Sequence, residues 1–194
     1  MANTSSKPSF ALSYGFVGGP AHGQKLRKLA TQAGFVPTSL DKADIIIAHS
    51  AGCWLIPTSV QPKLVIYVGM PLAMARAPRT WIRANLESFK EGNVMQNFSL
   101  RLKNTHYGLR QPLRNLGIIR EANTKIGNPV IIASTSAIFI ANHDDPWPRS
   151  EEHQQALMNT QAWAFIGMPG DHNNIWYQPE RYVAIMEHYA TLLA

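Results

Sequence analysis

A serine, a histidine and two aspartates stand at positions in this 194-residue chain that suit nucleophilic acyl chemistry. Ser50 lies in the small-residue stretch 48–52, His172 follows a Pro-Gly pair, and Asp144 and Asp145 precede a proline. A serine hydroxyl is a weak nucleophile until a base takes its proton, and that base is usually an imidazole oriented by a carboxylate. These residue types therefore predict attack of a serine on an acyl carbon.

Each of these residues comes three or four positions after a strand-like apolar run. The runs cover residues 44–47, 137–141 and 163–168. Short β-branched and aromatic runs bounded by turn residues are typical of buried strands. Parallel strands present their carboxyl ends at one edge of a sheet, where α/β sites lie. The sequence thus predicts that the serine, the aspartates and the histidine meet there, in that chain order.

The remaining pattern predicts a small α/β fold, with a mostly parallel sheet of about five or six strands flanked by helices. Residues 64–68 form a further strand-like run, residues 24–32 are helical in pattern, and residues 179–193 predict a closing helix with proline in its first turn. Only 49 residues precede Ser50, so the first units must be abbreviated. We expect a short strand at residues 35–36 and a turn through residues 40–41.

Three motifs carry a resemblance to the α/β-hydrolase superfamily. Residues 48–52 resemble the nucleophile elbow G-x-S-x-G, with alanine replacing the first glycine. The Asp-Asp-Pro-Trp run at 144–147 and the Gly-x-His-Asn run at 170–173 resemble the small single-domain serine hydrolases related to retinoblastoma-binding protein nine. This resemblance implies a Ser50, His172 and aspartate triad that works without a cofactor.

The resemblance also bears on which aspartate is the acid. In those small hydrolases it is the aspartate directly before the proline, which corresponds to Asp145 here. A looser spacing found in larger members, counted toward Pro148, favours Asp144 instead. Asp145 is the preferred assignment.

Acyl transfer also needs donors for the developing oxyanion. In the family one donor is the amide after the nucleophile, here that of Ala51. The other comes from the loop after the first core strand, and residues 15–19 resemble that loop with Tyr14 replacing its histidine. The resemblance therefore implies the Phe16 amide as the second donor. The same glycines do not have the spacing of a dinucleotide fingerprint or a P-loop.

A basic insert separates the strand at 64–68 from the strand before the aspartates. Residues 71–128 contain ten Lys or Arg and three Glu, and they account for the whole net charge of +6. Inserts near this point of the fold commonly cap the active site, so a helical cap or lid within one domain covering residues 1–194 is expected. An electropositive rim would attract anionic substrates. A solvated basic face explains the same charges.

Several other classes of protein are disfavoured. No zinc spacing or nucleic-acid-binding motif accompanies the arginines. A metal cluster of His143, Asp144, Asp145 and His172 can be imagined, but the triad explains the same residues with fewer assumptions. The single cysteine, Cys53, fits a small buried residue. With no internal disulfide possible, no signal-peptide pattern at residues 1–8 and no apolar stretch long enough to span a bilayer, a cytoplasmic location is expected.

The expected activity is that of a carboxylesterase-like serine hydrolase acting on a small acyl substrate. Two alternatives remain open. In the first, the protein is a protein-binding module whose site is inherited but idle, because a fold does not guarantee turnover. In the second, the same triad passes the acyl group to an acceptor other than water, or cleaves an amide.

Overall fold

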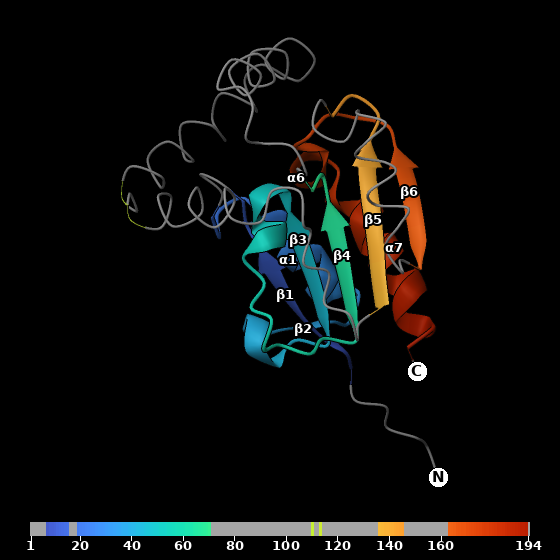
Figure 1. Ribbon diagram of the computed structural model, residues 1–194. Coiled ribbons are helices and arrows are strands. Elements are labelled where there is room, and N and C mark those ends of the chain that lie inside the picture. Colours follow the sequence, from blue (N-terminus) through green and yellow to red (C-terminus); the bar gives the residue numbers. More distant parts are fainter. Residues whose placement is uncertain are drawn as a thin grey trace.

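A six-stranded parallel β-sheet forms the centre of the protein (Figure 1). In the computed structural model the described residues are 7–15, 19–70, 110, 113, 136–145 and 163–193. All five strand pairs are parallel, in the order β2-β1-β3-β4-β5-β6. The strands are β1 (Ser9–Ser13), β2 (Val36–Pro37), β3 (Ile45–His49), β4 (Leu64–Val68), β5 (Ser136–Asn142) and β6 (Ala164–Met168).

The central strands are almost entirely apolar because both faces of the sheet are covered, and His49 at the end of β3 is the polar exception. Every residue of β3 and β4 is buried. Side chains alternate between the faces, so Ile45 and Ile47 enter one core cluster while Ile46 and Ala48 enter the other. A strand buried on both faces must be a continuous apolar run, which is why these strands are readable in the sequence.

Three helices cover one face of the sheet, behind it in the view of Figure 1. They are α1 (Gln24–Gln32), α6 (Asn174–Tyr177) and α7 (Pro179–Thr191). Helix α1 buries Leu26 and Ala30, which lie four residues apart and so share one side of the helix. Helix α7 begins at a proline, whose missing N–H is not needed in a first turn. The large core on this face therefore joins segments from both ends of the chain.

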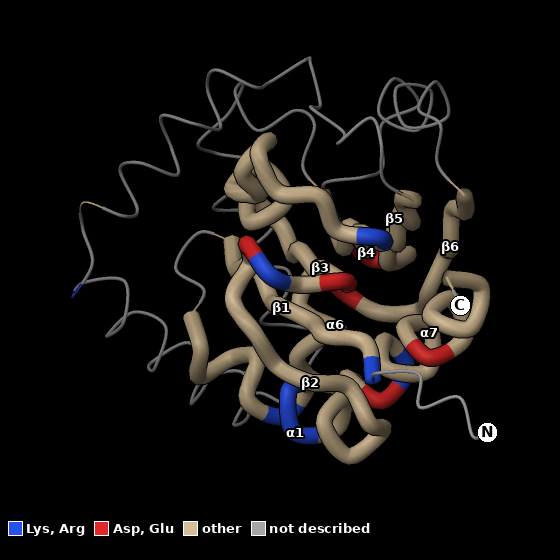
Figure 2. Tube along the Cα trace, turned by 90° about the horizontal axis from the view of Figure 1, so that it is seen from below, with Lys and Arg blue, Asp and Glu red and all other residues tan. Residues whose placement is uncertain are grey.

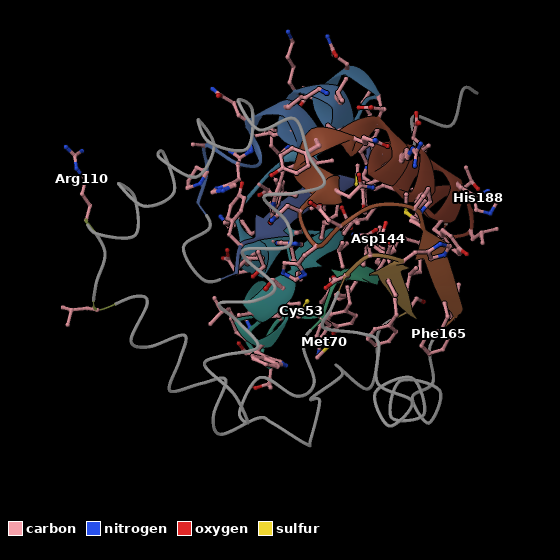
Figure 3. All side chains as sticks on the ribbon, turned by 90° about the horizontal axis from the view of Figure 1, so that it is seen from above. Cys53, Met70, Arg110, Asp144, Phe165 and His188 are labelled. Atoms are coloured by element: carbon pink, nitrogen blue, oxygen red, sulfur yellow. The ribbon has the colours of Figure 1, made fainter. Side chains whose placement is uncertain are left out.

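The opposite face is covered in part by the segment that follows β3. A 3-10 helix, η2 (Ser50–Trp54), buries Ala51, Cys53 and Trp54 against this face. Farther along the sheet, the rings of Tyr67 and Phe139 stack with centroids 4.8 Å apart. Phe139 stacks in turn on Phe165 at 5.5 Å. Phe165 lies on the edge strand β6 (Figure 3) and is 46% exposed. The stacked row therefore leads from the core to the rim of the sheet.

The expected fold class and strand number are confirmed, with the sheet parallel among all described strands. The short second strand appears as Val36–Pro37, followed by a 3-10 turn, η1 (Leu40–Lys42). The nucleophile elbow that residues 48–52 resemble is a strand-to-helix turn. The helix that follows β3 here is η2, a five-residue 3-10 helix, and Pro57 soon follows it. The short helix α6 was not predicted. The expected cap at 71–128 lies outside the described residues, apart from Arg110 and Leu113.

Charged side chains of the described residues lie mainly on outer surfaces, and Figure 2 shows basic residues grouped on α1. Lys25, Arg27 and Lys28 are exposed there. Most of the basic residues of the insert fall outside the described ranges. Within those ranges, no helix combines the length and the apolar character that crossing a membrane requires.

Candidate active site

Ser50 stands at the sharp turn between β3 and η2, at the carboxyl end of the sheet. Its backbone has a φ of 55°, the only positive value for a non-glycine residue among those described. An L-residue pays a steric cost in this left-handed region because its Cβ approaches the following carbonyl oxygen. Strained backbone of this kind is found at functional sites, where the surrounding structure enforces it. The turn lifts Ser50 out of the strand direction.

Gly15 packs directly against this turn. A Cβ added to Gly15 would lie 2.8 Å from the Cβ of Ser50 and 3.1 Å from the amide nitrogen of Ala51. Any side chain at this position would push the loop after β1 away from the serine. The backbone at Gly15 therefore lies against the two residues proposed as nucleophile and oxyanion donor. Phe16, the other expected donor, follows Gly15 but lies outside the described residues.

The loop after β5 and the loop after β6 meet through a carboxylate–imidazole pair. Asp145 Oδ2 lies 2.7 Å from His172 Nδ1. Asp145 is completely buried, whereas the adjacent Asp144 is exposed and its backbone amide donates to the carbonyl of Gly170. Figure 3, seen from the carboxyl end of the strands, labels Asp144 on this loop. Of the two candidate acids, Asp145 is the one hydrogen-bonded to the histidine.

The pair also determines the protonation of His172. Because a carboxylate can only accept, Nδ1 carries the proton of the hydrogen bond, and the neutral ring then has Nε2 free of a proton. Burial lowers the pKa of His172, but the charge and hydrogen bond of Asp145, together with the charge of Asp171, raise it above the ordinary 6.5. An imidazole in this tautomer can act as a base through Nε2.

Gly69, the residue after β4, leaves space for this pair. Its φ is 55°, and an added Cβ would lie 2.7 Å from Asp145 Oδ2 and 3.0 Å from His172 Nδ1. Both the conformation and the contact therefore require glycine. The sequence shows a glycine after a strand here, but nothing local indicates which side chains approach it.

A buried polar network holds the histidine loop in place. Tyr182 on α7 donates to Asn142 Oδ1 at 2.8 Å, and Asn142 Nδ2 donates to the carbonyl of Asp171 at 2.8 Å. Asn174 Nδ2 donates to the carbonyl of Pro169 at 3.0 Å. Burial raises the pKa of Tyr182 to about 12, so the phenol stays protonated and able to donate. The loop on both sides of His172 is thus fixed to β5 and α7.

Two of the residues that accompany the site were missed as functional candidates. His49, inside the 48–52 motif, is buried beside His172, with ring centroids 4.7 Å apart. Trp176 on α6 lies against His49 with centroids 5.0 Å apart. The signal for His49 was its place directly before Ser50. Nothing in the sequence indicates that it meets a residue 123 positions later.

The described residues include no group of three or more His, Cys, Asp or Glu side chains arranged to hold a metal ion. Cys53 is buried, and burial raises the pKa of its thiol. The thiolate form needed for nucleophilic attack is therefore disfavoured, in line with the expected packing role.

Comparison with solved structures shows what this architecture is. A carboxylesterase structure from the thaumarchaeon Nitrososphaera gargenis is similar with a TM-score of 0.61 and 10% identity, covering 96% of this chain and 91% of that one. The chain has an α/β-hydrolase fold. A monoacylglycerol lipase from Paleococcus ferrophilus gives a TM-score of 0.59 at 9% identity, covering 97% of both chains. A methylesterase from Arabidopsis gives 0.58 at 13% identity, covering 95% of this chain and 99% of that one.

These α/β-hydrolase structures resemble the chain over nearly its whole length, although few residues are identical. Neither the protein-family models nor the curated protein sequences compared with the chain match it. At such identities the likeness establishes the fold and not the substrate. The roles of individual residues must therefore be argued from their own geometry.

Proposed function

We propose that this protein is a serine hydrolase that cleaves an ester or a related acyl bond through Ser50, His172 and Asp145. The observation that carries the proposal is the 2.7 Å Asp145–His172 hydrogen bond, formed at the same end of the sheet as the strained turn at Ser50. The fold, shared with esterases and a lipase, supports hydrolysis in general.

In the proposed reaction Ser50 Oγ attacks the acyl carbon while His172 Nε2 takes its proton. The oxyanion accepts hydrogen bonds from the amides of Ala51 and Phe16. When the tetrahedral intermediate collapses, the bond to the leaving alcohol breaks and His172 returns the proton to it. Water, activated by the same imidazole, then releases the acid and restores Ser50. Asp145 keeps Nδ1 protonated throughout.

The strain at Ser50 and the space at Gly15 support this arrangement. A sharp turn sets the half-buried Ser50 at the carboxyl end of β3, and the glycine lets the loop after β1 approach the Ala51 amide. An anionic substrate, a cap formed by residues 71–128 and a cytoplasmic location remain parts of the proposal that rest on the sequence. The contact from Ser50 Oγ to His172 Nε2 is the part that experiment must test.

A fluorophosphonate probe tests the proposal directly, because it labels only a serine whose hydroxyl is activated. We expect the wild type to be labelled and Ser50→Ala to be unlabelled. Ser59→Ala is the matched control, since Ser59 is an exposed serine in the following loop and should not affect labelling. Turnover of a simple ester should fall by roughly 10⁴ to 10⁶ in Ser50→Ala.

An unlabelled but folded wild type would contradict the proposal and favour an idle, protein-binding role. A labelled enzyme that does not hydrolyse esters, yet transfers the acyl group to an added amine or alcohol, would favour the transferase alternative. Product analysis with and without such acceptors distinguishes the two.

A further inference from the structure

His49 connects the strand that carries the nucleophile to the loop that carries the base. Its Nε2 lies 2.7 Å from the main-chain oxygen of His172. A carbonyl oxygen can only accept a hydrogen bond, so Nε2 carries the proton and donates. His49 is 5% exposed, and its ring packs against the imidazole of His172 and the indole of Trp176. Its orientation is therefore fixed by packing as well as by the hydrogen bond.

His49 is suited to this contact because it stays neutral. Burial first, and then the neighbouring charge of His172, hold the pKa of His49 well below its ordinary value. A neutral imidazole with its proton on Nε2 satisfies the buried carbonyl without placing a second positive charge beside the base. An apolar side chain would leave that carbonyl without its donor, which is costly in a buried position.

We infer that His49 is a positioning residue that sets the distance between the base and the nucleophile. The inference rests on the proposed function. Asp145 holds His172 at Nδ1 of its side chain, and His49 holds it at its main-chain oxygen. Since Ser50 follows His49 directly, a shift of the histidine loop relative to His49 is a shift relative to the nucleophile.

The reactive geometry of such a pair is sensitive to small displacements. A misplacement of about 1 Å can cost on the order of 10²-fold in rate. His49→Leu removes the donor while keeping an apolar side chain of comparable bulk. His49→Gln keeps an N–H donor at a similar distance from the backbone. The two variants therefore separate the hydrogen bond from the packing.

The first test measures kcat, KM and the rate of fluorophosphonate labelling for the wild type and both variants. We expect kcat and the labelling rate to fall by about 10- to 100-fold in His49→Leu, with KM changed by less than about threefold. His49→Gln should recover most of the loss. Leu26→Ala is the control for lost stability, because Leu26 is fully buried on α1 and should leave kcat unchanged below its unfolding temperature.

The second test does not depend on activity. Nitrogen-15 NMR of the imidazole rings in the resting protein should show His49 protonated on Nε2 and His172 protonated on Nδ1. A wild type that shows this pattern but is never labelled overturns the proposed function and leaves the hydrogen bond supported. Equal labelling of wild type and folded His49→Leu overturns the inference. So does His49→Gln being as impaired as His49→Leu, or His49 carrying its proton on Nδ1.

Discussion

The backbone of Ser50 has a conformation that its side chain does not favour, with φ at 55°. The cost of this left-handed conformation disappears with glycine. We therefore expect Ser50→Gly to be more stable than Ser50→Ala by about 1 kcal/mol, although both variants lack the proposed nucleophilic hydroxyl. Urea unfolding at equilibrium measures the difference.

Both variants lose the hydroxyl, so their difference reports the backbone alone. The wild type should be close to Ser50→Ala in stability. A Ser50→Gly variant that is less stable than Ser50→Ala would mean that the turn is relaxed in solution and that the backbone of Ser50 is not strained.

The pair formed by Asp145 and His172 predicts the pH dependence of turnover. The base must be neutral, and the net effect of its surroundings raises the pKa of His172 above 6.5. Activity should therefore fall as pH falls through a value above 6.5. In Asp145→Asn the charge that raises this pKa is gone, so the acidic limb of kcat/KM should move to lower pH. The maximal rate should also drop by roughly 10³- to 10⁴-fold.

Asp144→Asn is the matched control, because Asp144 is exposed and neighbours the proposed acid, Asp145, in sequence. This variant should leave both the acidic limb of the kcat/KM profile and the maximal rate close to those of the wild type. Comparable losses in the two variants would argue against Asp145 as the acid, and near-normal rates in both would argue against the triad.

At the scale of elements, the loops that form the site approach each other closely because glycines at a few positions leave room for them. Gly69, the residue after β4, lies against the Asp145–His172 pair. Gly69→Ala places a Cβ in left-handed backbone and within 2.7 Å of Asp145 Oδ2. We expect a loss of stability of at least about 1–2 kcal/mol and a fall in kcat on the order of 10²-fold. Steady-state kinetics and urea unfolding measure both effects.

Gly34→Ala provides the comparison. Gly34 also has a positive φ, 101°, but an added Cβ would meet nothing closer than Lys7 Nζ at 3.7 Å. This variant should lose stability from backbone strain and keep its kcat. If Gly69→Ala retained kcat as well, the close approach at Gly69 would not control the site.

For the whole molecule, buried histidines predict sensitivity to acid. Burial lowers the pKa of His22 from 6.5 to about 4, so the unfolded chain binds a proton in this range that the folded chain does not. Stability is therefore lost as pH falls from 6.5 towards 4, by on the order of 3 kcal/mol for this group. His49 acts in the same direction. His172, whose pKa is raised, acts in the opposite direction, and its contribution to stability is already fully present below pH 6.5.

Urea unfolding at several pH values between 6.5 and 4 measures how steeply the free energy of unfolding falls with pH. In His22→Leu this dependence on pH should be weaker, whatever the absolute stability of the variant. An unchanged slope would show that His22 is protonated in the folded protein.

The fold could be predicted largely from local patterns. The strands at 45–49 and 64–68 are buried on both faces, so residues 45–48 and 64–68 form continuous apolar runs in the sequence. The placing of Ser50 and His172 at the carboxyl end of the sheet could be predicted because each follows a strand-like run. The choice between Asp144 and Asp145 could not be made from spacing, because adjacent residues in a turn point in different directions. The contact from His49 to His172 joins distant segments and leaves no local signal.

The packing of α7 on α1 has a consequence for how the protein is made. Tyr182 and Met186 complete a core begun by Phe10 and Leu26, and Lys25 Nζ lies 3.6 Å from a carboxylate oxygen of Glu180. The ribosome adds α7 long after β1 and β3, so the part of the sheet face that α7 covers is exposed to solvent during translation. Such a surface favours aggregation and chaperone binding. The proposed nucleophile is likewise translated long before its base, so hydrolysis cannot begin on the nascent chain.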